Sequence, residues 1–172
     1  MALDASQMLI NLGSSVGPMY QLVTGGAYLI GILFAVKALY QLKVYGEMRT
    51  MMGGQTSLKE PLMYLFVAGV FIYLPTGFSM MMETTFGYDN PLAYDQWPSA
   101  NGVSLSAASI VILSIVQLIG VIAFVRGWVL LAKGGQQGGG IGKGLVHIFG
   151  GVIAMNIVGA AVIISNTLGV QF

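Results

Sequence analysis

Four long apolar runs dominate the pattern of hydrophobic and polar positions, at about residues 19–42, 61–82, 105–132 and 145–169. Each run is about 20 residues or longer, the length of helix needed to cross a hydrocarbon layer about 30 Å thick. Such segments are helical because lipid offers no hydrogen-bond partners to open backbone groups. The pattern therefore predicts an all-α, single membrane domain over residues 1–172 with four transmembrane helices. Pro75 predicts a kink or an early end in the second helix.

The segment before the first run, residues 1–17, is mildly amphipathic. Its apolar side chains can share one face of a helix, and a break is expected where Gly13 to Gly17 precede Pro18. This pattern predicts a short N-terminal amphipathic helix lying on the membrane surface. Asp4 stands where a signal peptide would carry Lys or Arg. We therefore expect either that no cleavable signal exists or that it has already been removed.

One apolar stretch occurs twice in the chain. Residues Leu29-Ile-Gly-Ile-Leu-Phe-Ala-Val-Lys37 return as Leu118-Ile-Gly-Val-Ile-Ala-Phe-Val-Arg126, and each copy ends in a cation. A shorter match joins Leu62-Met-Tyr-Leu-Phe66 to Leu145-Val-His-Ile-Phe149. Internal repeats of this kind usually mark a repeated structural unit.

The repeat divides the chain into two tandem helical hairpins, at residues 18–82 and 105–172. Because each unit holds an even number of helices, the two hairpins run in the same sense. They would form a parallel repeat, related by an axis along the membrane normal. The segment between them, residues 83–104, is acidic and aromatic and predicts a connecting loop.

Composition narrows the class of protein. The chain is 56% hydrophobic and only 8% charged, whereas soluble domains average about 25% charged residues. This balance favours a membrane protein or an apolar polymer. The net charge of +1 argues against nucleic acid as a main partner. The absence of cysteine excludes disulfides, thiolate metal sites and thiol catalysis.

Charge in the connections predicts the orientation. The first and third connections are basic, whereas the 83–106 connection is acidic and has no basic residue. By the positive-inside rule the two basic connections face the cytoplasm. Both termini and the 83–106 loop then lie on the other side.

Two cations lie late in apolar runs, Lys37 and Arg126. A charge inside a span is a functional candidate by default, but both lie within one or two turns of the predicted cytoplasmic end. Long basic side chains there can extend to the head groups, so we predict contact with phosphate. A buried pair or a place on an ion path remains the alternative. Arg126 and Lys133 share a helix face because they are seven residues apart.

Small residues recur at four-residue spacing in three of the runs and predict close helix packing within or between subunits. These candidate packing residues are Ala27, Gly31, Ala35, Gly120, Ala123, Gly127, Gly150 and Ala154. The glycine run 134–144 resembles a phosphate-binding loop but fails its pattern, since Gln137 replaces the first glycine and Gly144 replaces the final Ser or Thr. A flexible turn between packed helices is expected there.

Two polar residues in the last run are candidates for interhelical hydrogen bonds, His147 and Asn156. The single histidine cannot form a metal site alone, and a proton relay is its alternative role. The runs contain no catalytic constellation of acids, nucleophile and base. The sequence therefore predicts neither an enzyme nor a metal or cofactor site.

The stretch Lys143-Gly-Leu-Val-His147-Ile-Phe-Gly-Gly-Val-Ile-Ala-Met-Asn156, the glycine-rich turn and the four spans together resemble a known family. They are similar to the small membrane proteins called IcmC/DotE of Dot/Icm type IVB secretion systems and to the related TraQ of IncI-type conjugation. The likeness covers the whole architecture, but only residues 138–156 are motif-like. It implies a component of a bacterial conjugation or effector-export machine in the inner membrane, with periplasmic termini and a periplasmic 83–106 loop.

Each half also resembles a two-helix conjugative pilin, a hairpin with a basic turn that polymerises with bound phospholipid. The chain departs from pilins in being double. The resemblance implies that five basic residues face a lumen and meet lipid head groups: Lys37, Lys43, Arg126, Lys133 and Lys143.

We therefore expect a non-enzymatic structural subunit whose partners are copies of itself, phospholipid and other secretion or conjugation components. It would be extracellular if assembled as a pilus. No sequence-specific nucleic acid binding and no cofactor other than bound phospholipid are expected. Two alternatives remain: a fixed inner-membrane component of the same apparatus, or a small ion channel or transporter with Lys37 and Arg126 on the path.

Overall fold

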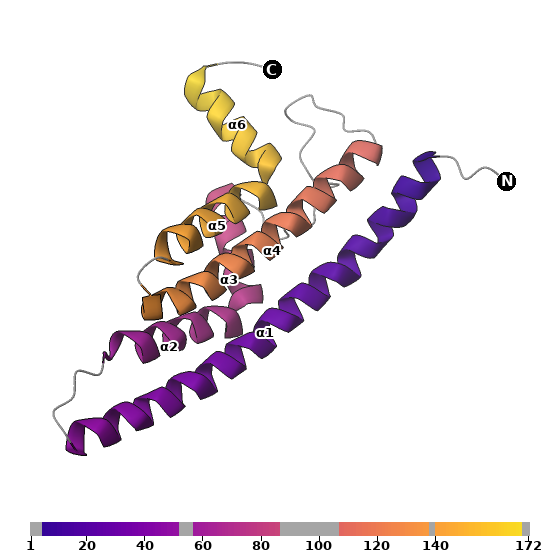
Figure 1. Cartoon of the computed structure of the whole chain (residues 1–172). Helices are drawn as coiled ribbons and strands as arrows, with labels where there is room; N and C mark the ends of the chain where they lie inside the picture. The colour runs from indigo at the N-terminus through magenta and orange to yellow at the C-terminus, as the bar shows by residue number, and fades with distance from the viewer. Residues whose placement is uncertain (1–4, 52–56, 87–106, 138–139, 170–172) are drawn as a thin grey trace.

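The computed structural model describes residues 5–51, 57–86, 107–137 and 140–169, and over these residues it is helical with no strand. The helices are α1 (Ala5–Met51), α2 (Lys59–Ile72), α3 (Leu74–Phe86), α4 (Ala107–Gln137), α5 (Gly140–Met155) and α6 (Ile157–Leu168) (Figure 1). The expectation of an all-α fold is confirmed.

Two helices are long and apolar enough to cross a membrane unaided, over Asn11–Thr50 in α1 and Ser109–Gly134 in α4. The pairs α2–α3 and α5–α6 each reach that length only when taken together, and each is bent at a short break. The chain therefore has two candidate spans, or up to four if each bent pair makes one crossing. These helices indicate a membrane protein, as expected.

The N-terminal segment is not a separate amphipathic helix, because α1 runs unbroken from Ala5 to Met51 with Pro18 inside it. Contact with α4 accounts for this difference. A Cβ on Gly13 would lie 2.8 Å from Val111 Cγ2, and Val16 is buried. This packing offsets the cost of Pro18, about 3 kcal/mol in a helix interior. With 47 residues, α1 is about 70 Å long at about 1.5 Å per residue.

The predicted kink near Pro75 is present. Helices α2 and α3 meet at 70°, and the break falls at Tyr73. Pro75 then occupies the first turn of α3, where the backbone N–H that proline lacks would have no helical partner. The helix also extends to Phe86, into the predicted connecting loop. The rest of residues 83–104 lies outside the described residues.

The last apolar run was expected to form one helix, but it is broken at Asn156, where α5 and α6 meet at 93°. Asn156 has φ −137° and ψ 62°, and its side chain accepts a hydrogen bond from the Gly159 N–H. Asparagine is among the residues that best cap a helix N-terminus. A local cap therefore ends one helix and starts another inside a continuous apolar run.

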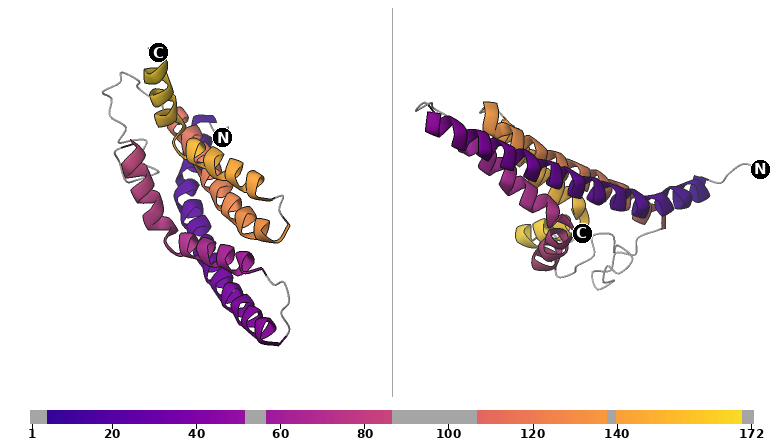
Figure 2. Two further views of the ribbon diagram at one scale, coloured as in Figure 1. Left: turned by 90° about the vertical axis from the view of Figure 1, so that its left-hand side faces the viewer. Right: turned by 90° about the horizontal axis from the view of Figure 1, so that it is seen from below.

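Helices α1 and α4 run side by side in the same direction, and α2 and α5 return along them (Figures 1 and 2). Figure 2 shows α3 and α6 turning away from the directions of α2 and α5. The core lies where α1, α2, α4 and α5 meet, and it includes Phe71, Val121 and Phe124. Large apolar side chains such as Leu22, Leu29 and Val146 cover the outside. Helices that expose apolar side chains in this way are typical of membrane proteins.

Candidate functional site

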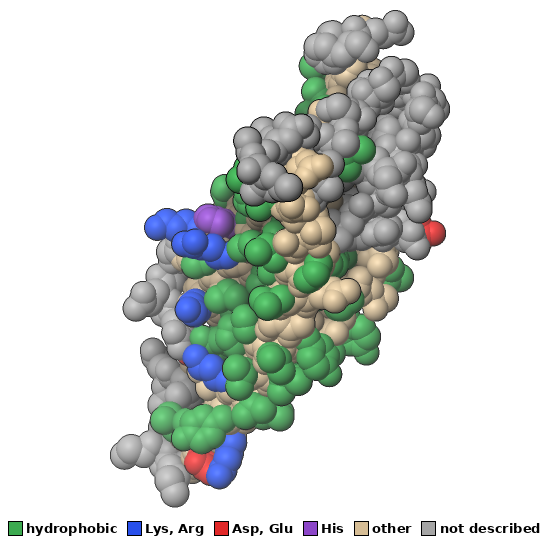
Figure 3. Space-filling model, turned by 90° about the vertical axis from the view of Figure 1, so that its right-hand side faces the viewer, with side chains coloured by type: hydrophobic (Ala, Val, Ile, Leu, Met, Phe, Trp, Pro, Cys, Tyr) green, Lys and Arg blue, Asp and Glu red, His purple; other side chains and the backbone are tan. Residues whose placement is uncertain are grey.

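Basic side chains gather at one end of the molecule. All of the Lys and Arg residues lie in the C-terminal half of α1 or α4, or in the first turns of α2 or α5. Because α1 and α4 end where α2 and α5 begin, these segments share one end (Figure 1). Figure 3 shows basic side chains along one edge of the surface, beside apolar ones. Glu83, near the far end of α3, lies away from them.

Lys37 is tied to the second helix of its hairpin. Its Nζ donates a hydrogen bond of 2.8 Å to the hydroxyl of Tyr64 and lies 4.2 Å from the centre of that ring. Tyr64 is only 1% exposed, and the ring of Phe34 meets it edge-on at 5.3 Å. The cation is thus anchored by a phenol and by the face of an aromatic ring. The remaining N–H groups of the ammonium can donate to another acceptor.

The other basic candidates are exposed: Arg126, Lys133, Lys143 and Lys43. Lys43 Nζ lies 3.7 Å from Glu47 Oε1 one turn along α1, and both side chains are well exposed. Such surface pairs contribute about 0–1 kcal/mol. Arg126 and Lys133 lie on one face of α4, as their spacing predicted.

His147, a predicted interhelical residue, makes a hydrogen bond within α5. Its Nδ1 lies 2.8 Å from the Lys143 carbonyl oxygen. A carbonyl only accepts, so Nδ1 carries a proton. The Asn156 side chain accepts a hydrogen bond from the Gly159 N–H within its own segment, and its interhelical contact stays a prediction. Both polar residues therefore shape local structure in α5 and α6.

Helices α4 and α5 touch through glycine backbone. Gly120, Gly127 and Gly134 recur every seven residues on α4, as Gly144 and Gly151 do on α5. A Cβ on Gly120 would lie 2.6 Å from the Met155 nitrogen, and one on Gly151 would lie 2.7 Å from the Gly120 oxygen. A Cβ on Gly144 would lie 2.9 Å from the Gly127 oxygen. Any side chain at these positions would force the two helices apart.

The structure brings most predicted packing residues into contacts. Gly31, Gly120 and Gly127 make close approaches, Ala27 is buried, and Ala35, Ala123 and Ala154 are partly buried. Gly150 differs, because it is exposed and no described atom lies within 4 Å of a Cβ placed there. The glycine that packs in α5 is its neighbour Gly151, which the four-residue spacing missed. The shared seven-residue spacing of the α4 and α5 glycines would have identified it.

The first hairpin has a matching contact. A Cβ on Gly31 would lie 2.8 Å from Phe71 Cβ and 3.3 Å from the Ala68 oxygen and the Ile72 nitrogen. The sequence match that pairs Leu62 with Leu145 also pairs Ala68 with Gly151 and Ile72 with Met155. These are the positions that contact Gly120 in the second hairpin. The two repeated glycines thus meet corresponding backbone atoms.

The helix breaks correspond as well. Helix α2 ends at Ile72 and α5 at Met155, which the same match pairs. The breaks at Tyr73 and Asn156 follow directly. Each hairpin therefore consists of a long first helix and a second helix that breaks one residue beyond the glycine contact.

Gln117, a buried amide near the second break, was not among the predicted site residues. Gln117 is 0% exposed, and neither of its side-chain polar atoms has a partner among the described residues. It precedes Gly120 by about one turn, so it is level with the end of α5, which Gly120 contacts. An unpaired buried amide costs about 1–3 kcal/mol. A lone glutamine in the apolar run 105–132 was the available signal.

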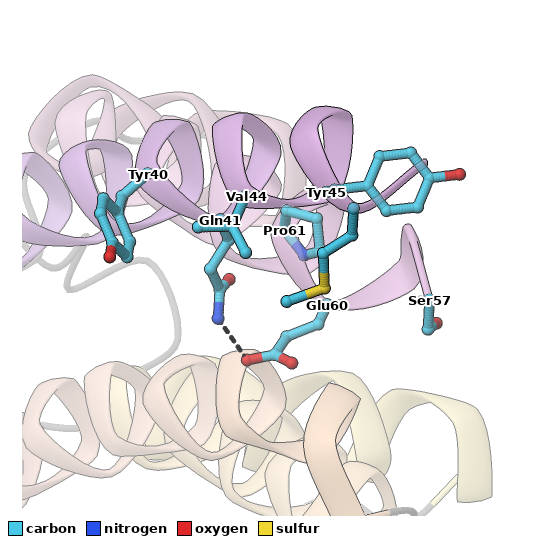
Figure 4. A pocket seen from close by; sticks show the side chains of 8 residues that line it. Tyr40, Gln41, Val44, Tyr45, Ser57, Glu60 and Pro61 are labelled. Carbon is cyan, nitrogen blue, oxygen red and sulfur yellow. Dashed lines mark hydrogen bonds between the residues drawn. The ribbon is translucent and has the colours of Figure 1, made fainter. Parts of the chain in front are cut away.

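A cavity of about 270 Å³ lies between the end of α1 and the start of α2. Figure 4 shows the Gln41 and Glu60 side chains pointing toward one another across it. Gln41 Nε2 donates a hydrogen bond to Glu60 Oε1, while Gln41 Oε1 is buried with no partner among the described residues. An acidic residue in this basic end was not among the predicted site residues.

Most of the glycine run 134–144, which was predicted to be a flexible turn, is helical. Helix α4 continues through Gln137 and α5 begins at Gly140. Within the described residues, no three His, Cys, Asp or Glu side chains are grouped to hold a metal ion.

Comparison with protein-family models, with curated proteins and with solved structures finds no match to this chain.

Proposed function

We propose that this chain is a non-enzymatic structural subunit of a bacterial type IVB secretion or conjugation apparatus, built as a duplicated membrane hairpin that assembles with copies of itself. The observation that carries the proposal is the correspondence between the two halves. In both, the repeated glycine meets the same pair of backbone positions and the second helix breaks at the matching residue. Building blocks of this kind suit an assembly in which one contact is repeated many times.

The cations support the same proposal. Lys37 and Arg126 occupy matching places in the repeat, at the end of the molecule that holds the other basic residues. We propose that this end faces the cytoplasm in the inner membrane and that its cations contact phospholipid phosphate, in a bilayer or along a lumen. The termini and the 83–106 loop would then be periplasmic.

Imaging of purified material tests assembly directly. The chain with an affinity tag after Phe172 is purified from membranes and from sheared extracellular material and examined by electron microscopy. We expect filaments containing this chain and stoichiometric phospholipid. A small closed oligomer that stays in the membrane would instead assign it to a fixed component of the apparatus.

Gly150 offers a sharper test because no described atom of the same chain lies within 4 Å of a Cβ placed there. If the Gly150 and Ala154 face packs between copies, Gly150→Leu will abolish filaments while the hairpin remains folded. Gly25→Leu is the matched control, since Gly25 is also exposed with no described atom near a Cβ. Filaments that survive Gly150→Leu would exclude this face as the contact.

A small transporter or channel is the second candidate, favoured by Gln117 and the broken helices. Transporters commonly bind substrate where spanning helices are interrupted near the midplane, and Gln117 is a buried polar group level with such a break. The test is ion flux in liposomes containing the purified chain. Flux that is lost in Gln117→Leu and in Lys37→Met would support transport, whereas no flux from the unchanged chain would remove this candidate.

A further inference from the structure

The cavity between α1 and α2 differs in chemistry from the surface around it. Lys43 and Lys59 flank it in sequence, yet the described residues that line it include the carboxylate of Glu60 and no basic side chain. Apart from Gln41 and Ser57, the remaining lining is aromatic and apolar, from Tyr40, Tyr45 and Met48 among others. An acidic, aromatic hollow therefore interrupts the basic end of the molecule.

The polar atoms of the cavity are arranged to accept hydrogen bonds. Gln41 donates a hydrogen bond from its amide N–H to Glu60. Its carbonyl oxygen therefore remains as a second acceptor beside the carboxylate (Figure 4). That oxygen is buried and has no donor among the described residues. Glu60 also lies in the first turn of α2, where negative charge is favoured by the helix dipole. A ligand that carries N–H groups would supply the donor that Gln41 Oε1 lacks, and a positive charge on it would suit the neighbouring carboxylate.

From these features we propose that the cavity binds the primary ammonium group of a zwitterionic phospholipid head group, of the phosphatidylethanolamine type. The ammonium would donate to Gln41 Oε1 and to Glu60 while resting against Tyr40. The phosphate of the same head group would reach Lys59, the cation next to Glu60 in the first turn of α2. A quaternary choline head group fits the aromatic lining but has no N–H for the two acceptors.

Size and position agree with a head group as the occupant. At about 270 Å³ the cavity is slightly smaller than the sites of drug-sized ligands, about 300–1,000 Å³, so it can take a head group but not a whole lipid. Tyr40 and Tyr45 are the kind of residue that collects at a membrane–water interface. The inference rests on the membrane placement proposed above but does not require that the chain forms filaments.

Lipid retention measured by native mass spectrometry tests the site. The full chain is reconstituted in vesicles of equal parts dioleoyl phosphatidylethanolamine, phosphatidylcholine and phosphatidylglycerol and then extracted in mild detergent. We expect phosphatidylethanolamine to be retained over the other two, and Glu60→Gln to reduce this preference about fivefold. Glutamine at this position can still accept from Gln41, so the fold should be kept.

Glu47→Gln is the matched control, because it removes the same charge from α1 at an exposed site outside the cavity lining. It should leave the lipid preference unchanged. Gln41→Leu, which removes the second acceptor, should weaken the preference as Glu60→Gln does. Circular dichroism and thermal melts of each variant verify that the helices remain folded.

Three results would overturn the assignment. They are equal retention by the unchanged chain and Glu60→Gln, retention of phosphatidylcholine equal to that of phosphatidylethanolamine, and preference for phosphatidylglycerol.

A measurement without substitution is transfer of nuclear magnetisation from ¹⁵N-ethanolamine lipid to ¹³C-labelled glutamate carboxyl groups, which should reach Glu60. Intact filaments without selection of phosphatidylethanolamine would contradict this inference and leave the proposed assembly standing. Lipid selection without filaments would leave it standing and remove the proposed assembly.

Discussion

The contact between Lys37 and Tyr64 shows how one residue pair can hold a cation within an apolar helix. The ammonium both donates to the phenol and lies close to its ring, while the tyrosine itself is buried in the core and meets the ring of Phe34. The charge therefore stays near the surface while its anchor belongs to the interior. Such an anchor fixes the depth of the cation relative to both helices of the hairpin.

We predict that Lys37→Met and Tyr64→Phe are coupled by about 1 kcal/mol, the size typical of a partly exposed charged hydrogen bond with an aromatic contact. The free energy of unfolding of both single variants and the double variant would be measured in mixed detergent micelles. The matched cycle uses Lys43→Met and Glu47→Gln, an exposed pair whose coupling should stay below about 0.5 kcal/mol. Equal coupling in the two cycles would contradict the anchoring role of Tyr64.

Replacement of Gln117 is predicted to stabilise the protein rather than destabilise it. Because both polar atoms of its buried side chain have no partner among the described residues, replacement by leucine of similar size removes a desolvation cost. Gln117→Leu should raise the free energy of unfolding by about 1 kcal/mol. Val121→Thr, which adds a polar atom at a buried position nearby, should lower it. A loss of stability in Gln117→Leu would mean that the amide has a bound partner, such as water.

At the scale of the element, two adjacent glycines of α5 are predicted to respond in opposite directions. A Cβ on Gly151 would lie 2.7 Å from both the Gly120 oxygen and the Phe124 nitrogen, whereas no described atom lies within 4 Å of one on Gly150. Gly151→Ala should therefore cost about 1–3 kcal/mol through overpacking. Gly150→Ala should gain up to about 1 kcal/mol because alanine favours the helix.

Unfolding in mixed micelles measures both variants, and each serves as the control for the other. The register of the α4–α5 contact would be wrong if the two substitutions had the same effect. The same comparison can be made in the first hairpin, where Gly31→Ala should destabilise and Gly25→Ala should not.

The break at Asn156 depends on one side chain. Its oxygen accepts from the Gly159 N–H, and loss of such a cap typically costs about 1 kcal/mol. Because the flanking residues are apolar and small, Asn156→Leu should favour a continuous helix and open the bend of 93°. Spin labels at the exposed positions Val146 and Leu168 would report this change. Their separation should increase toward about 33 Å, the length of a straight helix over this interval.

At the scale of the whole molecule, the features that sequence could predict were those carried by composition and spacing. The apolar runs predicted the helices and Pro75 predicted the first bend. The repeated glycine indicated two helix–helix contacts that the structure contains. The features that it could not predict depend on tertiary contact or on a single cap. Continuity of α1 through Pro18 relies on packing of Gly13 against Val111, and the second bend interrupts an apolar run that has no other sign of a break.

The basic end of the molecule yields a prediction about orientation. The chain contains no cysteine, so single introduced cysteines report their own accessibility without background. If the basic end faces the cytoplasm, Ser57→Cys will resist a membrane-impermeant maleimide in intact spheroplasts and react only after lysis. Thr84→Cys, near the far end of α3, will react before lysis.

This experiment also distinguishes between two and four crossings. If each bent pair spans the membrane, Thr84 and Thr167, close to the C-terminal ends of α3 and α6, lie on the side opposite Ser57. Both cysteine variants would then react in intact spheroplasts. If the bends instead return α3 and α6 to the side on which α2 and α5 begin, both would be protected with Ser57→Cys. The 70° and 93° bends would in that case form re-entrant segments, and the duplicated unit would consist of one full crossing and one partial crossing.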